Sequence, residues 1–168
     1  MIILKFIICI IIILICSYLG MEKSKDYQRR VLELQKIKNA LSFFKSKIEF
    51  TYEPVKEILA GISKSIYLEE DNIFGKTEEY MKSNSVNIAW NKAVEEESKI
   101  SKEDKEILKM FGKLLGKTDK KGQISEIDLS LTFIEKQIQK AEAEKNKNSK
   151  LFKSLGVLVG IGITIILW

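Results

Sequence analysis

Two apolar runs, one at each end of the 168-residue chain, constrain the fold more than any other feature of the sequence. The first run, residues 2–19, contains eighteen residues and a single charge, which is long enough for a helix to cross a bilayer. The second run, residues 155–168, is shorter, but Leu151 and Phe152 extend it towards the same length. We therefore predict an N-terminal transmembrane anchor at residues 1–20, a helical domain at 21–150 and a C-terminal transmembrane anchor at 151–168.

The flanks of the two runs predict their orientation. The first run is better explained as a retained anchor than as a cleaved signal peptide, because no Ala-x-Ala cleavage site lies around Cys16. Under the positive-inside rule the basic flanks, and the domain between them, lie in the cytoplasm. The basic residues of these flanks are Lys23, Lys25, Arg29 and Arg30 after the first run, and Lys145, Lys147, Lys150 and Lys153 before the second.

The composition argues against an enzyme and against nucleic-acid binding. The chain has no histidine, and both cysteines, Cys9 and Cys16, lie in the first apolar run, so we expect no catalytic residue, cofactor or metal. Residues 116–118 resemble the end of a phosphate-binding loop, but Phe111 occupies the position of the first glycine of such a loop. Acidic residues alternate with lysines and are expected to form a solvated face; they include Glu95, Glu96, Glu97, Glu103, Asp104 and Glu106.

Between the anchors the apolar residues recur at helical spacing, and the chain holds a single proline. This pattern predicts an all-α fold, a compact helical bundle of about six helices flanked by the transmembrane helices. Residues 26–50 form one amphipathic helix, and Pro54 opens the next. Ser85 is expected to cap a short helix, and Ser101 with Asp104 to form a capping box. Large side chains predicted to fill the core are Phe74, Tyr80, Met81 and Trp90.

Residues 114–123 form a corner before a long helix. Apolar residues recur at spacings of three and four from Ile124 to Ile138, and the pattern continues into the last apolar run. One helix is therefore predicted to leave the corner, cross the domain and enter the membrane. We expect Gly116 to end the preceding helix, Thr118 to cap the long one, and Asp119 to lie in its first turn, where the helix dipole favours its charge.

Lys120 and Lys121 follow Asp119 and have the wrong sign for the start of a helix. Two interpretations stay open: the lysines are tolerated on an exposed turn, or they bind an acidic partner surface. Under the second, the partner-binding residues are Lys117, Lys120, Lys121 and Gln123. In the last run, Gly156 and Gly160 have the spacing at which helices pack closely in a membrane, although glycine is also simply frequent in such helices.

Several short motifs carry a resemblance to a known family. They are Leu115-Gly-Lys-Thr-Asp119 with Gly122-Gln123, Ile48-Glu49 before Pro54, Ala89-Trp90, and Ser154-Leu-Gly156. Together with the two anchors, these motifs resemble the stage III sporulation protein AB family of endospore-forming Firmicutes. The resemblance implies a soluble domain similar to the cytoplasmic domains of type II secretion system protein F.

The same resemblance implies a non-enzymatic platform in the mother-cell membrane around the forespore, within an oligomeric channel or secretion-like complex. Its implied partners are a cytoplasmic ATPase similar to stage III sporulation protein AA and other membrane subunits of the complex. Two other functions stay open. A membrane-anchored coiled-coil scaffold without an ATPase partner would use residues 124–138 to dimerise, and a pore-forming protein would need only the two apolar helices.

Overall fold

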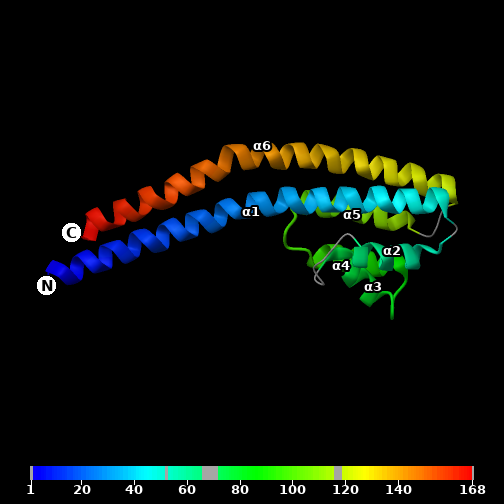
Figure 1. Cartoon of the computed structure of the whole chain (residues 1–168), viewed down its shortest axis with the longest axis horizontal. Helices are drawn as coiled ribbons and strands as arrows, with labels where there is room; N and C mark the ends of the chain where they lie inside the picture. Colours follow the sequence, from blue (N-terminus) through cyan, green and yellow to red (C-terminus); the bar gives the residue numbers. More distant parts are fainter. Residues whose placement is uncertain (1, 52, 66–71, 116–118, 168) are drawn as a thin grey trace. The chain divides into compact units, whose positions relative to one another are not determined.

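The computed structural model describes residues 2–51, 53–65, 72–115 and 119–167. Within these ranges the chain is all-helical and contains no strand, which confirms the predicted fold class (Figure 1). The six helices are α1 (Ile2–Phe50), α2 (Val55–Ser65), α3 (Ile73–Tyr80), α4 (Val86–Glu96), α5 (Lys102–Leu114) and α6 (Lys120–Leu167).

The two apolar runs belong to the two longest helices. Helix α1 extends over 49 residues without a break, so the first anchor and the amphipathic helix predicted at residues 26–50 are one element. No proline interrupts this segment, and Gly20 stays helical within it. Helix α6 extends over 48 residues, which confirms the prediction of a single helix that starts at the corner and includes the last apolar run.

By its internal contacts the chain divides into two compact units, and both long helices contribute to each. One unit comprises residues 1–31 and 139–168, and the other comprises Leu32–Ile138. The domain boundaries predicted at residues 20 and 151 concern entry into the membrane and stay a prediction.

The core of the Leu32–Ile138 unit is centred on Trp90, which is fully buried as predicted. The indole Nε1 donates a hydrogen bond of 2.7 Å to the backbone oxygen of Leu108. The ring meets Phe74 and Phe111 edge-on, at centroid distances of 5.4 and 5.2 Å, and Phe111 in turn meets Phe44 at 5.9 Å. Edge-on aromatic pairs at these distances stabilise a core beyond the area that they bury. The aromatic cluster therefore ties α1, α3, α4 and α5 together.

Gly112 lets the indole approach α5 closely. A Cβ atom at this position would lie 2.2 Å from Trp90 Cδ1 and 3.0 Å from Trp90 Nε1. The indole could then no longer occupy its place beside the Leu108 carbonyl. Glycine at position 112 is thus required by packing, and the sequence pattern did not indicate it.

Local signals at helix starts are mostly confirmed. Ser101 and Asp104 form the predicted capping box, with Asp104 Oδ2 accepting from Ser101 N at 2.8 Å. Ser85 is the N-cap residue of α4, although its side chain makes no capping hydrogen bond.

The prediction that Tyr80 is a core residue is wrong. Its side chain is partly exposed, and its hydroxyl donates a hydrogen bond of 2.7 Å to Glu96 Oε1. This position near the end of α3 lets the phenol reach water.

The prediction of a uniformly solvated acidic face is wrong at two of its six positions. Asp104 is only 1% exposed because it closes the capping box, and Glu97 is only 5% exposed. Glu97 Oε1 accepts a hydrogen bond of 2.8 Å from the backbone nitrogen of Lys99, just after α4 ends. Asp104 satisfies the backbone donor of the N-cap residue of α5, and Glu97 satisfies a backbone donor in the loop between α4 and α5.

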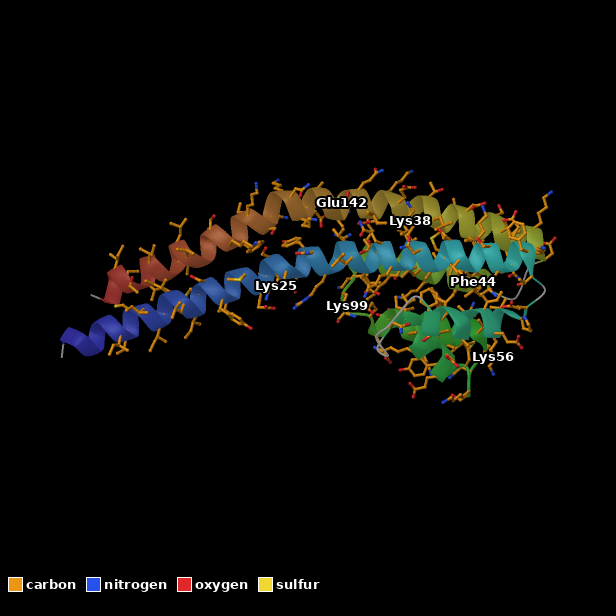
Figure 2. All side chains as sticks on the ribbon, viewed as in Figure 1. Lys25, Lys38, Phe44, Lys56, Lys99 and Glu142 are labelled. Carbon is orange, nitrogen blue, oxygen red and sulfur yellow. The ribbon has the colours of Figure 1, made fainter. Side chains whose placement is uncertain are left out.

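In the Leu32–Ile138 unit, α1 and α6 are joined by apolar contacts and by ion pairs. Ile127 and Ile134 of α6 are almost fully buried. At the edge of this interface Lys38 pairs with Glu135 at 2.9 Å and Lys45 pairs with Asp128 at 2.7 Å. The pairs are seven residues apart on both helices, the repeat expected of two helices that stay in contact over several turns. Lys38 is labelled in Figure 2.

Candidate functional site

The end of α1 lies against the corner at the start of α6, and the surface is hollowed there. A groove of about 360 Å³ opens there, wholly within the Leu32–Ile138 unit. Its lining residues are Ile48, Thr51, Glu53, Pro54, Val55, Lys120 and Gln123. Two of the four predicted partner-binding residues, Lys120 and Gln123, therefore line one groove. Lys121 follows Lys120 in the sequence and is exposed but is not part of the lining, and Lys117 lies outside the described residues.

Lys120 has a structural partner in the corner. Its Nζ donates a hydrogen bond of 2.6 Å to the backbone oxygen of Glu49, in the last turn of α1. The last carbonyls of a helix have no acceptor role within the helix and carry a partial negative charge, so a lysine there is favourable. Thr51 satisfies another carbonyl of the same helix end. Its backbone nitrogen and its Oγ1 both donate to Lys47 O, at 2.8 and 2.6 Å. The start of α6 is thereby attached to the end of α1.

The cap of α6 differs from the prediction. Asp119, not yet in the helix, is the capping residue: its Oδ1 accepts a hydrogen bond of 2.9 Å from Gly122 N. Its backbone oxygen accepts the first helical bond, from Gln123 N at 3.0 Å. Aspartate both satisfies an amide and places a negative charge at the positive end of the dipole, so it serves as well as threonine. The predicted roles of Gly116 and Thr118 fall on residues outside the described ranges.

Among its described residues the corner exposes positive charge on Lys120 and Lys121. Lys121 forms no ion pair with any carboxylate among the described residues. By contrast, Lys47 in the last turn of α1 pairs with Glu53 at 2.8 Å. Across the described parts of the chain, no group of three histidine, cysteine or acidic side chains is arranged to hold a metal ion. The groove therefore offers an apolar wall, from Ile48 and Val55, beside exposed positive charge.

The glycines of the last run meet α1 within the unit formed by residues 1–31 and 139–168. A Cβ atom on Gly156 would lie 2.7 Å from Cys16 O and 3.1 Å from Gly20 Cα, and one on Gly160 would lie 3.0 Å from Ile13 Cα. At Gly156 only glycine permits such an approach of two backbones, whereas at Gly160 a Cβ atom would require a shift of a few tenths of an ångström. Sequence reasoning missed Gly20, although Cys16 and Gly20 repeat the small-residue spacing of the other helix.

Polar and aromatic contacts continue this helix pair beyond the glycines. Ser24 and Ser149 share a hydrogen bond between their hydroxyls, and Tyr27 stacks on Phe152 at a centroid distance of 5.9 Å. Arg30 Nη1 then donates a hydrogen bond of 2.6 Å to Glu144 Oε2. The pair is therefore close-packed at the glycines and becomes progressively polar away from the apolar ends.

Both long helices contain an 18-residue window that is apolar enough to cross a membrane. Only 11% of the window in α1 and 6% of that in α6 is buried, so neither is the buried core helix of a water-soluble domain. Large side chains such as Leu14, Leu158 and Ile166 are instead mostly exposed. The two helices are candidate membrane spans, as predicted.

Comparisons with known proteins agree with the resemblance in the sequence. The family described as stage III sporulation protein AB matches residues 5–168. Stage III sporulation protein AB of Bacillus subtilis (strain 168) is 28% identical over 169 residues, 98% of this chain and 99% of that protein. A solved structure of stage III sporulation protein AB has a TM-score of 0.63 at 24% identity, and the match covers 71% of this chain and 98% of that one, which supports the fold. Because the family match extends over nearly the whole sequence, the chain belongs to the stage III sporulation protein AB family, a family of sporulation proteins.

Proposed function

We propose that this chain is a non-enzymatic membrane platform in the channel or secretion-like complex that joins the mother cell to the forespore. The observation that carries the proposal is a family match over residues 5–168 in a chain with an apolar helix at each end. Both anchors cross the mother-cell membrane around the forespore, and the domain between them lies in the cytoplasm. The lysines that flank each anchor support this orientation.

The platform docks a cytoplasmic ATPase similar to stage III sporulation protein AA through the corner groove. The groove combines apolar side chains with exposed lysine, which suits an acidic, partly apolar surface on a partner. Lys121 is the residue most available for that contact, because Lys120 is bound to the end of α1. Gln123 lines the same groove and supplies a side chain that both donates and accepts hydrogen bonds.

The docking proposal is tested by exchanging one charge. Lys121→Glu places a negative charge at the groove, and Lys136→Glu makes the same change 15 residues further along α6, about 22 Å away. We expect Lys121→Glu to abolish co-purification of the ATPase from sporulating cells and to arrest sporulation after engulfment, with Lys136→Glu close to normal. Normal ATPase recovery and spore yield in the Lys121→Glu variant would refute docking at the corner.

Membrane orientation is tested separately. A cysteine is appended after Trp168 in a chain with Cys9→Ala and Cys16→Ala. The chain is produced in non-sporulating cells, where the anchors cross the plasma membrane, and the intact cells are treated with a membrane-impermeant thiol reagent. We expect labelling without permeabilisation, because the C-terminus lies outside the cytoplasm. Labelling only after permeabilisation would show that the C-terminal anchor does not span.

The alternative is a membrane-anchored coiled-coil scaffold that dimerises through residues 124–138. The burial of Ile127 and Ile134 within a single chain disfavours it, because those side chains already belong to the core. The two functions differ in a simple measurement. A scaffold of this kind loses self-association when Ile134→Asp is introduced but keeps a folded domain, whereas in the platform the same change unfolds the domain.

A further inference from the structure

A hollow of about 240 Å³ lies beside the helix pair in the unit formed by residues 1–31 and 139–168. Its side chains are two lysines, two amides and a hydroxyl, all of which can donate hydrogen bonds. They are Gln28 on α1 and Lys145, Asn146, Ser149 and Lys150 on α6. Such a set suits an oxyanion carrying several acceptor oxygens, above all a phosphate group.

The positive charge at this hollow is uncompensated, in contrast to that on α1. On α1, Lys25 pairs with Glu22 at 2.6 Å, Arg29 pairs with Asp26 at 3.2 Å, and Arg30 pairs with Glu144 at 2.6 Å. Among the described residues neither Lys145 nor Lys150 has a carboxylate partner. The two helices therefore have similar basic flanks by sequence, but only that of α6 is left with charge to offer a ligand.

The hollow is built at the depth where a lipid headgroup would lie. Ser149, in its lining, is fixed by the hydrogen bond to Ser24. Tyr27 stacks on Phe152 just beyond it, an aromatic pair of the kind found at the boundary between hydrocarbon and water. Lys150 precedes the apolar run at Leu155 by five residues, about 7.5 Å along the helix axis. A phospholipid whose phosphate group is held there places its acyl chains alongside the anchors.

We propose that this hollow binds the phosphodiester headgroup of an anionic phospholipid such as phosphatidylglycerol. Lys145 and Lys150 pair with the phosphate oxygens, and Gln28 and Asn146 donate hydrogen bonds to the headgroup. The inference rests on the proposed insertion of both anchors, which brings the hollow to the membrane surface. The bound lipid would neutralise the positive charge of Lys145 and Lys150 on α6. It would also add to the contacts that hold the helix pair together.

The test is lipid retention by the full-length chain, purified in a mild detergent and measured by native mass spectrometry with added phosphatidylglycerol or phosphatidylcholine. We expect the unaltered chain to retain phosphatidylglycerol about tenfold over phosphatidylcholine, since each lysine near a headgroup favours an anionic lipid. The variant Lys145→Gln/Lys150→Gln should lose this preference. The matched control is Lys147→Gln/Lys153→Gln, which removes the same charge from the same helix at residues outside the hollow, and it should keep the preference.

Three results would overturn the proposal. Equal loss of preference in the two double variants would mean that diffuse charge, not the hollow, selects the lipid. An unchanged preference in Lys145→Gln/Lys150→Gln would exclude the hollow altogether. Displacement of phosphatidylglycerol by millimolar inorganic phosphate would assign the site to a free anion. Because retention in detergent does not depend on orientation, failure here is distinguishable from failure of the thiol-labelling test of the anchors.

Discussion

Lys120 and Glu49 are 71 positions apart in the sequence, yet the ammonium group of one lies 2.6 Å from the backbone oxygen of the other. The bond joins the first turn of α6 to the last turn of α1. A lysine that is unfavourable for the dipole of its own helix is thus favourable for the dipole of its neighbour. The penalty that the sequence predicts at Lys120 has a structural compensation and needs no partner to explain it.

This relationship predicts different effects for two adjacent lysines. Lys120→Glu removes the bond to Glu49 O and brings a negative charge to the negative end of α1. This loss exceeds the gain from a better match to the dipole of α6, so the change should lower the free energy of unfolding by roughly 0.3 to 1 kcal/mol. Lys121→Glu should leave stability unchanged or slightly raised, because it improves the match to the dipole of α6. Thermal unfolding of the full-length chain in detergent, followed by circular dichroism, checks both. Equal stability of the two variants would contradict the role assigned to Lys120.

The corner shows which features a sequence predicts and which it does not. The position of the turn follows from local signals, the end of one apolar stripe and the start of another, and the structure bears it out at Lys120. The identity of the cap depends on the backbone within one turn, and there Asp119 does what was expected of Thr118. The partner of Lys120 depends on how two distant helix ends meet, which periodicity does not encode.

Gly112 and Gly61 form a natural pair for testing the core. Gly112→Ala should destabilise the chain by about 1 to 3 kcal/mol, because the added carbon would meet Trp90 Cδ1 at 2.2 Å and displace the indole from Leu108 O. Gly61 lies within α2, and a Cβ atom there meets nothing within 4 Å. Gly61→Ala should therefore stabilise by roughly 0.5 to 1 kcal/mol through helix propensity.

Chemical denaturation of both variants in a Trp168→Phe background, monitored by Trp90 fluorescence and by circular dichroism, gives the comparison. A Gly112→Ala protein as stable as the unaltered chain would show that the indole is not held as described. The sequence indicated Trp90 as a core residue from its size and its place on an apolar face, and that is correct. It did not indicate that a glycine 22 positions later makes room for the ring, because that contact joins two helices.

Glu95 predicts a dependence of stability on pH. A hydrogen bond from Lys109 holds the pKa of the Glu95 carboxyl below its ordinary value, and joins α4 to α5. A lowered pKa in the folded state contributes stability above the unfolded pKa of about 4.3, and this contribution is lost as the pH falls through the folded value. Glu95→Gln should thus lower the melting temperature at pH 7, and the difference should vanish at strongly acid pH. The effect is small, because the pair is exposed to solvent.

Glu79→Gln serves as the control for this measurement, since Glu79 is exposed and forms no ion pair within the described ranges. It should leave the difference from the unaltered chain flat across the same pH range. A pH-independent difference for Glu95→Gln would contradict the pairing with Lys109. The cross-helix pairs show why a charge run is hard to interpret from sequence: Glu95 and Lys109 looked like members of a solvated face, and only the fold brings them to 2.7 Å.

The last prediction concerns the contact between the two apolar helices. A Cβ atom on Gly160 would lie 3.3 Å from the Cβ of Cys16, close to the 3.5 to 4.5 Å that a disulfide spans. In a chain with Cys9→Ala, Gly160→Cys should therefore form an intramolecular disulfide with Cys16 on mild oxidation. Gly162→Cys is the control, because nothing lies within 4 Å of its Cβ position. On a non-reducing gel the first variant should run as a faster monomer, and the second should be unchanged. A crosslinked dimer from Gly160→Cys would instead mean that the glycine face joins two protomers. The absence of any crosslink would contradict the contact with Cys16 and leave only the frequency of glycine in membrane helices to explain Gly160.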